Sequence, residues 1–317
     1  MSDLAGKRVW VAGHRGLVGS ALVRRLDREP IGELIIATSS QLDLRRQSET
    51  EAFVTDRKPE IVILAAARVG GINANRLSQA EFLYDNLMIA ANVIDATHRH
   101  GVEKVVVLGS SCIYPREAAQ PIREDALLTG PLEPTNEGYA IAKIAALELT
   151  KMYRRQHGMD AISLMPTNLY GPEDNFDLGS GHVLAALLRK IHEAKVAGAD
   201  TVEVWGSGRP RREFLHVDDL ADAAVFALWH YEGEGHLNVG TGRDISISEL
   251  ASMIAGVVGW EGAFAFNTEM PDGTPRKLLD VSRLAEMGWR ATIELRDGLE
   301  RTYRWFLEHQ QEVSTLR

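Results

Sequence analysis

Three small polar side chains, Ser110, Ser111 and Cys112, stand next to one another in the stretch LGSSCIYP, and Cys112 is the only cysteine of the chain. They directly follow the apolar run KVVVL, which is typical of a buried strand. A thiol beside two hydroxyls at a strand end can bind a substrate or transfer a proton. A lone cysteine more often packs as a small hydrophobic residue, so on this stretch alone both interpretations of Cys112 stay open.

Three glycines near the N-terminus form a second candidate site. In VWVAGHRGLVGSALVRRL, Gly13, Gly16 and Gly19 lie between a predicted strand and a predicted helix, with the spacing G-x-x-G-x-x-G. This spacing differs by one residue from the dinucleotide-binding fingerprint, but the physical basis is the same. Glycines let the backbone approach a pyrophosphate, and the helix N-terminus offers free N–H groups. The loop therefore predicts a bound dinucleotide.

The residues after the second predicted strand indicate which dinucleotide binds. NAD-binding folds usually carry a carboxylate about 20 positions beyond the glycines, where this chain has Thr38, Ser39 and Ser40. No carboxylate there would repel a 2′-phosphate, and the Arg15 guanidinium could bind one. The pattern favours NADP(H) over NAD and places Asp43 nearer to the adenine edge than to the ribose.

A tyrosine and a lysine add a third element of chemistry. Tyr139 and Lys143 are four residues apart in a stretch predicted to be helical from about Asn136, so they share one helix face. The reference pKa of a phenol, about 10, is too high for proton transfer near neutrality. We expect the lysine cation and the charge of the nicotinamide to lower it. With a serine from the strand end, these side chains would hold a ketone facing a hydride donor.

The elements that must position these residues alternate regularly in the first half of the chain. Strands are predicted at 8–13, 33–38, 60–67 and 104–110, and helices at 16–29 and 78–100. Strands that are apolar throughout and alternate with helices indicate an α/β fold with a Rossmann-type, doubly wound parallel sheet.

The alternation loosens in the second half, where glycine, proline and charged residues multiply. We therefore expect an NADP-binding domain over 1–170 and a smaller, less regular C-terminal domain for the substrate over 171–317. The boundary is approximate, because chains of this type cross between the two lobes.

The composition excludes several classes of protein. The 317 residues carry a formal net charge of −9, which disfavours non-specific binding to nucleic acid or to acidic membranes. The first residues run into a strand pattern without the apolar core of a signal peptide, and no stretch approaches the about 20 apolar residues of a membrane span. One cysteine rules out an internal disulfide framework and fits a reducing cytoplasm, where we expect the protein. We predict no metal site.

One short basic run stands out in this acidic chain. The stretch GRPRRE places Arg209, Arg211 and Arg212 within four residues. Such a run is either a solvated surface or a clamp for a diphosphate, which guanidinium groups bind well. Arg212 is the strongest candidate for the clamp.

Along almost its whole length, the chain resembles the extended short-chain dehydrogenase/reductases, and within them the GDP-L-fucose synthase family. The cysteine after the two serines is the most specific feature, because plain reductases and 4-epimerases of this superfamily commonly lack it. The motifs that carry the resemblance are AGHRGLVGSA, LAAARVGGINAN, LGSSCIYP, LEPTNEGYAIAKIA, MPTNLYGPEDNF, VWGSGRPRREFLHVDD, NVGTG and PDGTPRKLLDVSRL.

The resemblance implies roles for the matching residues. Ser110, Tyr139 and Lys143 match the family's reductive triad, and Cys112 and His182 match its epimerisation pair. The residues expected at the cofactor are Gly13, His14, Arg15, Gly16, Leu17, Val18, Gly19, Ser39, Asp43, Leu108, Gly109, Ser110, Ser111, Tyr139, Lys143, Pro166, Thr167, Asn168, Leu169 and His182. Those expected at the GDP-sugar are Lys190, Trp205, Arg212 and Asp272.

The family's substrate is GDP-4-keto-6-deoxy-D-mannose and its product is GDP-L-fucose. The ketone at carbon 4 acidifies the hydrogens on carbons 3 and 5, so inverting these centres needs a base on one ring face and an acid on the other. A thiol with a reference pKa of about 8.5 and an imidazole near about 6.5 suit this task near neutral pH. Ser110 and Tyr139 could support the same oxygen during epimerisation and reduction. The resemblance also implies a homodimer formed through two long helices.

One departure and three alternatives stay open. The family carries an arginine at the end of the second strand, where this chain has Ser39, so the strength of the NADP preference is open. A nucleotide-sugar 4-epimerase would return its hydride and would have no use for Cys112. A GDP-colitose-type synthase would invert one centre rather than two. A nucleotide-sensing protein without activity would need an incomplete triad, whereas serine, tyrosine and lysine are all present.

Overall fold

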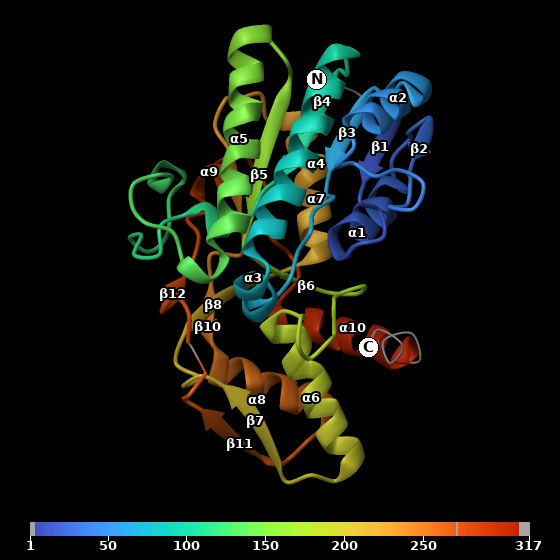
Figure 1. Ribbon diagram of the computed structural model, residues 1–317. Helices are drawn as coiled ribbons and strands as arrows, with labels where there is room; N and C mark the ends of the chain where they lie inside the picture. Colours follow the sequence, from blue (N-terminus) through green and yellow to red (C-terminus); the bar gives the residue numbers. More distant parts are fainter. Residues whose placement is uncertain (1–3, 271, 311–317) are drawn as a thin grey trace.

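A six-stranded parallel sheet forms the centre of the molecule (Figure 1). The computed structural model describes residues 4–270 and 272–310. The spatial order of the strands is β2-β1-β3-β4-β5-β9, and every neighbouring pair is parallel. Their bounds are β1 (Arg8–Ala12), β2 (Glu33–Ile35), β3 (Ile61–Leu64), β4 (Lys104–Leu108), β5 (Ala161–Pro166) and β9 (Leu237–Val239). The predicted Rossmann-type sheet is confirmed, with β2 shorter than expected.

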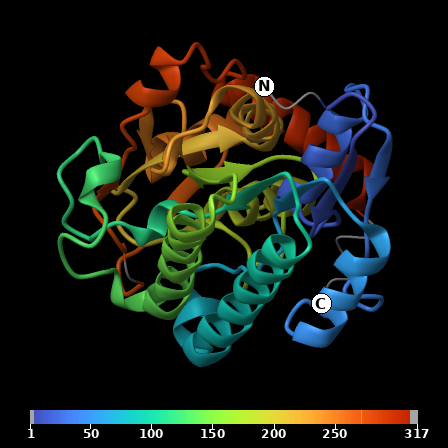
Figure 2. The same cartoon turned by 90° about the horizontal axis from the view of Figure 1, so that it is seen from above.

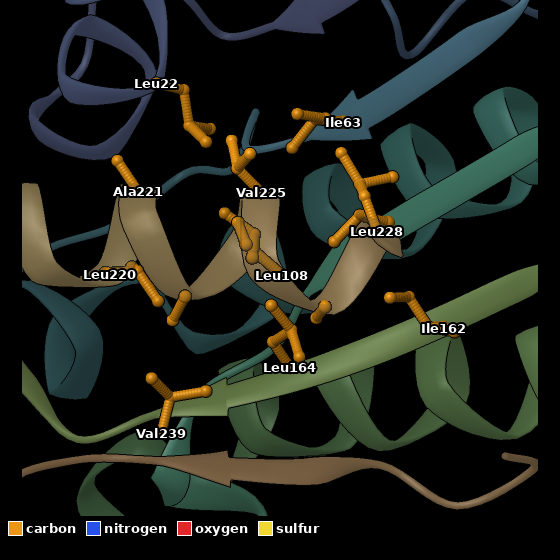
Figure 3. Packing of buried hydrophobic residues seen from close by; sticks show 14 of the residues in the cluster. Leu22, Ile63, Leu108, Ile162, Leu164, Leu220, Ala221, Val225, Leu228 and Val239 are labelled. Atoms are coloured by element: carbon orange, nitrogen blue, oxygen red, sulfur yellow. The ribbon is translucent and has the colours of Figure 1, made fainter. Parts of the chain in front are cut away.

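Helices cover both faces of this sheet, which explains why its strands are apolar at every position. In β3, Ile61 and Ile63 face one core while Val62 and Leu64 face the other. The first core lies under α1 (Leu17–Leu26) and α7 (Val217–His230); Figure 3 shows Leu22 and Val225 of these helices near Ile63. The second core lies under α2 (Gln47–Arg57), α4 (Gln79–Arg99) and α5 (Glu137–His157). Figure 2 shows α4 and α5 side by side on that face.

A second, smaller part packs below the carboxyl edge of the sheet (Figure 1). Its central strand β8 (Arg211–His216) pairs in parallel with β6 (Asn168–Tyr170) and β12 (Arg276–Lys277), and antiparallel with β10 (Asp244–Ser246). Strands β7 (Thr201–Trp205) and β11 (Ala263–Asn267) form a separate parallel pair. The helices that bury its core are α6 (Val183–Ala197), α8 (Ile247–Val258) and α10 (Leu295–Glu308).

Short helices fill the connections between these parts. They are α3 (Ile72–Leu77), α9 (Ser282–Glu286) and the 3-10 turns η1 (Ser111–Ile113), η2 (Glu124–Ala126) and η3 (Pro134–Asn136).

The chain passes between the two parts more than once. Helix α7 packs against α1, and β9 pairs with β5, although both elements lie beyond residue 170. A division at residue 170 therefore stays an approximate prediction. In the part of the chain that the structure describes, no helix is both long and apolar enough to cross a membrane.

The strand order changes direction between β1 and β3, and this position determines where a ligand can enter. Loops that leave the carboxyl ends of these neighbouring strands diverge and open a crevice. Gly13 lies in that crevice with a φ of 91°, and a Cβ there would come within 2.7 Å of the Ala66 backbone. Gly19 of α1 packs against the carbonyl oxygen of Gly13 so closely that a Cβ would collide with it. Both positions require glycine.

Two helical glycines provide a test of this close packing. We expect Gly19→Ala to lower the free energy of unfolding by about 1–3 kcal/mol, the usual cost of overpacking. A Cβ added at Gly256 in α8 would meet only open space, so Gly256→Ala should raise the free energy of unfolding by about 0.4–1 kcal/mol. Urea unfolding of the two variants measures both values, and changes of the same sign would contradict this description of the glycine loop.

Candidate active site

A single cavity of about 980 Å³ lies at the carboxyl edge of the central sheet, between the two parts of the molecule. All the residues that the sequence analysis assigned to the cofactor, to catalysis or to the GDP-sugar line this cavity. They come from elements as distant in sequence as the glycine loop and the segment before β12. The structure brings the candidates together, while their individual roles stay predictions.

The glycine-loop end of the cavity fits a dinucleotide. Helix α1 begins after Gly16, which has no side chain to cap it, so the first N–H groups of the helix stay available to a phosphate. Arg15 is exposed there and makes no ion pair within the described residues, and Ser39 lines the same end. The Nδ1 atom of His14 is buried without a hydrogen-bond partner. Burial and the nearby Arg15 cation lower the pKa of His14.

Asp43 lies at the same end but is already engaged. Its carboxylate accepts two hydrogen bonds from the Arg45 guanidinium, at 2.8 and 2.9 Å. These bonds hold the pKa of Asp43 below its usual range. The carboxylate is therefore fixed in place at the rim where the adenine edge is predicted.

The serine, tyrosine and lysine meet beyond the end of β4. Ser110 precedes the η1 turn, and its hydroxyl accepts a hydrogen bond from the Cys112 N–H at 3.4 Å. Helix α5 presents Tyr139 and Lys143 on one face, with the Lys143 ammonium 5.7 Å from the centroid of the Tyr139 ring. Lys143 donates a hydrogen bond of 2.8 Å to the carbonyl oxygen of Leu108. Lys143 is thus hydrogen-bonded to the last residue of β4, the strand that directly precedes the serines.

One expectation about this cluster is wrong for the protein alone. The pKa of Tyr139 is raised rather than lowered, chiefly by burial, although a hydrogen bond with Ser110 acts in the opposite direction. Burial also lowers the pKa of Lys143 to about 8. Lys143 does not measurably offset the lost hydration of the phenol. Tyr139 is therefore a protonated hydrogen-bond donor at neutral pH.

The thiol and the imidazole enter the cavity from different elements. Cys112 follows β4 and is only 5% exposed, and burial raises the pKa of its thiol. His182 is the residue directly before α6. Its side chain is open to the cavity, yet protein atoms surround it closely enough that lost hydration lowers its pKa. Near neutral pH, burial therefore favours the neutral thiol of Cys112 and the neutral imidazole of His182.

The far end of the cavity presents an aromatic ring and a cation. The Lys190 ammonium lies 4.7 Å from the centroid of the Trp205 ring. Trp205 is 44% exposed, so it is not part of the hydrophobic core. An exposed ring of this kind is a surface on which a flat base can stack.

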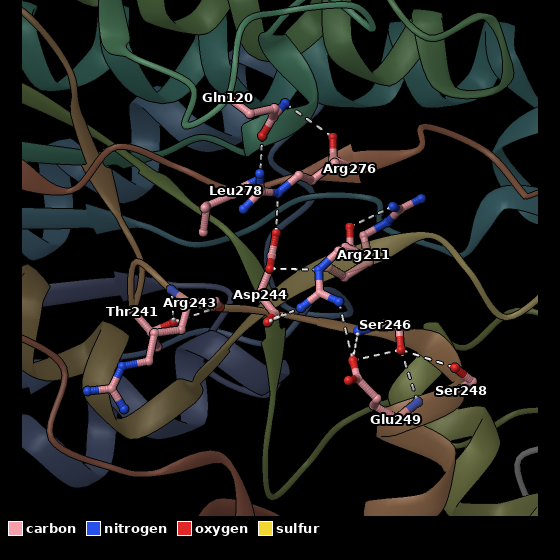
Figure 4. Close-up of polar contacts among 11 residues, drawn as sticks. Gln120, Arg211, Thr241, Arg243, Asp244, Ser246, Ser248, Glu249, Arg276 and Leu278 are labelled. Atoms are coloured by element: carbon pink, nitrogen blue, oxygen red, sulfur yellow. Dashed lines mark hydrogen bonds and ion pairs between the residues drawn. The ribbon is translucent and has the colours of Figure 1, made fainter.

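Of the three clustered arginines, only Arg212 lines the cavity. Figure 4 shows the Arg211 guanidinium bonded instead to Asp244 and Glu249. The Arg209 guanidinium donates to the Ser207 hydroxyl, outside the cavity. The three-arginine clamp is therefore reduced to one residue: Arg211 and Arg212 are adjacent in β8 and point to opposite faces, and Arg209 lies before the strand.

Asp272 fixes the loop beside Arg212. Its carboxylate accepts hydrogen bonds from the Ser207 N–H at 2.7 Å and from the Ser207 hydroxyl at 2.8 Å. Its carbonyl oxygen accepts a longer bond of 3.4 Å from Arg212.

Sequence reasoning missed several charged residues that also line the cavity, among them Glu133 and Lys277. Both lie within motifs that carry the family resemblance, LEPTNEGY and PDGTPRK. A charged side chain in such a motif is a signal that could have singled them out. Their presence in the same cavity depends on contacts between distant segments and could not be predicted from either motif.

Comparisons with known proteins show the family of the chain. The family model described as "NAD dependent epimerase/dehydratase family" matches residues 9–240. The chain is 57% identical to GDP-L-fucose synthase 1 of Arabidopsis thaliana, over 98% of this chain and 95% of that relative. It is 51% identical to GDP-L-fucose synthase of Escherichia coli (strain K12), over 97% of this chain and 98% of that relative. The solved GDP-L-fucose synthetase of Naegleria fowleri bound to NADP superposes with a TM-score of 0.90 at 27% identity, covering 98% of this chain and 97% of the other.

The exposed Arg15 allows a direct test of cofactor choice. We expect Arg15→Ala to weaken NADPH binding about 10–100-fold, the scale of one charged hydrogen bond, and to leave NADH binding nearly unchanged. Fluorescence titration with both nucleotides measures the difference, and Arg15→Lys serves as a control that keeps the charge. Equal losses for the two nucleotides would contradict a contact between Arg15 and the 2′-phosphate.

Proposed function

The chain belongs to the NAD dependent epimerase/dehydratase family and, within it, to the GDP-L-fucose synthases, and from that premise we propose how its residues carry out the reaction. The enzyme is an NADP-dependent epimerase and reductase. It converts GDP-4-keto-6-deoxy-D-mannose to GDP-L-fucose, inverting carbons 3 and 5 and reducing the ketone at carbon 4. The observation that carries the proposal is that the triad of a ketone reductase and a thiol–imidazole pair line one cavity.

The first stage moves protons and needs no hydride. Cys112 and His182 form the acid–base pair that removes a proton beside the ketone and returns one on the opposite ring face. When a C–H bond breaks, its electron pair moves toward the carbonyl oxygen and forms an enolate. Ser110 and Tyr139 donate hydrogen bonds to that oxygen. Their two hydroxyls lie at the end of β4 and on α5, beside the thiol.

The second stage uses the same oxygen. Bound NADPH supplies the hydride that reduces carbon 4. Tyr139 gives its proton to the oxygen: the phenol is protonated at neutral pH, and although burial makes it a weaker acid, the alkoxide formed at carbon 4 is a stronger base than a phenolate. Lys143 would hold the nicotinamide ribose, and its charge would stabilise the phenolate left after the proton transfer. The glycine loop with Arg15 would hold the rest of the dinucleotide.

The remaining polar residues hold the GDP part of the substrate. Arg212 binds the diphosphate, for which a guanidinium offers several donors. Trp205 and Lys190 bind the guanine end, and Asp272 keeps the adjoining loop in place through Ser207. This arrangement places the sugar ring toward Ser110 and Cys112.

We also propose that two copies of the chain pair through α4 and α5, and that the enzyme works in the cytoplasm. The two helices pack side by side and expose four large apolar side chains, Tyr84, Leu87, Ile141 and Met152. Large apolar side chains exposed on paired helices favour association. The single cysteine suits a reducing compartment. Sedimentation measures the oligomeric state.

The function is tested with purified protein, GDP-4-keto-6-deoxy-D-mannose and NADPH. We expect the wild type to yield GDP-L-fucose, and Cys112→Ser to yield a 6-deoxyhexose with uninverted centres, because a hydroxyl is a poor base in place of a thiol. Tyr139→Phe should lower turnover at least ~10²-fold while NADPH still binds. Product stereochemistry is read by nuclear magnetic resonance. If the Cys112→Ser enzyme still made GDP-L-fucose at the wild-type rate, Cys112 would have only a packing role.

The lowered pKa of Lys143 predicts the pH dependence of reduction. Below its pKa of about 8 the side chain is charged, and above it the charge is lost. Reduction should therefore slow as the pH rises through about 8, and Lys143→Arg should move this decline to higher pH because a guanidinium stays charged. Measuring the rate in the Cys112→Ser background removes epimerisation from the profile. A rate that keeps rising above this pH would rule out a role for the charged lysine.

A further inference from the structure

The imidazole of His182 lines the cavity without a polar contact of its own. Within the described parts of the chain, no hydrogen bond or ion pair reaches either of its ring nitrogens. Its place therefore depends on the backbone from which it projects, and a misplacement of about 1 Å can cost about 10²-fold in rate. We propose that Asp177 is a positioning residue for His182, because its carboxylate closes the turn over 177–181 that fixes this backbone. The inference rests on the proposed function.

The Asp177 carboxylate is the centre of this turn, although Asp177 itself does not line the cavity. Its Oδ1 atom accepts hydrogen bonds from the Ser180 N–H at 2.8 Å, the Ser180 hydroxyl at 2.8 Å and the Gly179 N–H at 3.1 Å. Its carbonyl oxygen accepts another from the Gly181 N–H at 2.8 Å. Hydrogen bonds to a charged acceptor are stronger than those between neutral groups. The residue directly before His182 is thus bonded to Asp177.

Asn175 reinforces the same turn. Its side-chain oxygen accepts a hydrogen bond of 3.0 Å from the Asp177 N–H, and its side-chain amide donates one of 3.0 Å to the Ser180 hydroxyl. The hydroxyl therefore donates to Asp177 and accepts from Asn175. Asparagine and aspartate favour such local bonds to nearby backbone groups. The bond from the Ser180 hydroxyl also holds the pKa of Asp177 below its usual range, so the carboxylate is charged at neutral pH.

The two ends of the turn are held by different parts of the molecule. On one side, Phe176 is buried in the core of the second part, with its ring centroid 4.9 Å from that of Phe306. On the other side, the Gly71 N–H of the first part donates a hydrogen bond of 2.8 Å to the Ser180 carbonyl oxygen. A Cβ at Gly71 would come within 2.6 Å of the Gly181 carbonyl oxygen, so the two segments are in direct contact. Because both ends are anchored, the closed turn between them determines where the imidazole enters the cavity.

The turn should matter for epimerisation and not for reduction. His182 belongs to the acid–base pair of the first stage, whereas the reductive triad comes from the end of β4 and from α5. A displaced imidazole slows inversion, while the hydride and the phenol proton still reach the ketone at their usual rates. A ketone that is reduced before inversion becomes an uninverted sugar. The ratio of inverted to uninverted product therefore reports the position of His182, and it does not depend on how much of a variant is folded.

The test measures this product ratio with GDP-4-keto-6-deoxy-D-mannose and saturating NADPH, by nuclear magnetic resonance of the product sugar. We expect Asp177→Ala to lower the ratio of inverted to uninverted product by about 10-fold or more, because the turn loses the acceptor that its donors share. Asp177→Asn keeps a side-chain oxygen that can accept the same N–H groups, so its ratio should stay nearer to that of the wild type. Ser180→Ala removes the hydroxyl alone and should lower the ratio less than Asp177→Ala.

Asp280 provides the matched control, because its carboxylate closes a comparable turn by accepting the Ser282 N–H at 2.9 Å, outside the cavity. Asp280→Ala should leave the product ratio unchanged. An unchanged ratio in Asp177→Ala overturns the proposal, and so does an equal fall in Asp280→Ala or a fall as large in Asp177→Asn.

Circular dichroism checks that each variant folds. If Asp177→Ala does not fold, Ser180→Ala decides, and an unchanged ratio in that variant overturns the proposal. Failure of the wild type to make GDP-L-fucose would contradict the proposed function instead. A wild type that makes it, with an Asp177→Ala variant of the same product ratio, would contradict only the role of Asp177.

Discussion

All six strands of the central sheet run in one direction, and the rest of the structure depends on this constraint. Parallel strands end at the same edge, so the loops after β1, β4 and β5 open into one crevice. A single residue, Thr167, separates β5 from β6, which pairs with β8 of the second part. The chain therefore passes from one sheet to the other at the crevice, and the cavity has walls from both. Cofactor, ketone and nucleotide residues share that space for this reason.

Burial is the second physical cause that runs through the site, and it acts on every reacting group. It raises the pKa of Tyr139 and Cys112 and lowers that of Lys143 and His182. The raised pKa of the Tyr139 phenol keeps its proton in place until reduction. For the thiol it is an obstacle, since a base must lose its proton first. The two stages therefore need opposite protonation states of a phenol and a thiol that line one cavity.

The first half of the fold could be predicted because its strands are buried on both faces and leave continuous apolar runs, as in β3 and β4. Strands of two or three residues, such as β12 and β6, leave no such pattern. The sequence did not predict that Arg212 lines the cavity while Arg211 does not, for a related reason. The two residues are adjacent, and they point to opposite faces only because they belong to β8, which was not predicted as a strand. The motifs were enough to predict which candidate catalytic residues share one cavity, whereas the pKa of Tyr139 depends on its burial and on Cys112 and Ser110, which only the folded chain brings beside it.

The central claim is that one cavity performs both the proton transfers and the hydride transfer on the same sugar. Carrying out the complete reaction in heavy water with unlabelled NADPH tests this most directly, with the isotope at each ring carbon of the product read by nuclear magnetic resonance. The account predicts deuterium at carbons 3 and 5 and ordinary hydrogen at carbon 4, with one NADPH consumed for each sugar. A product without deuterium at carbons 3 and 5 would contradict it, because the protein would then be a simple ketone reductase.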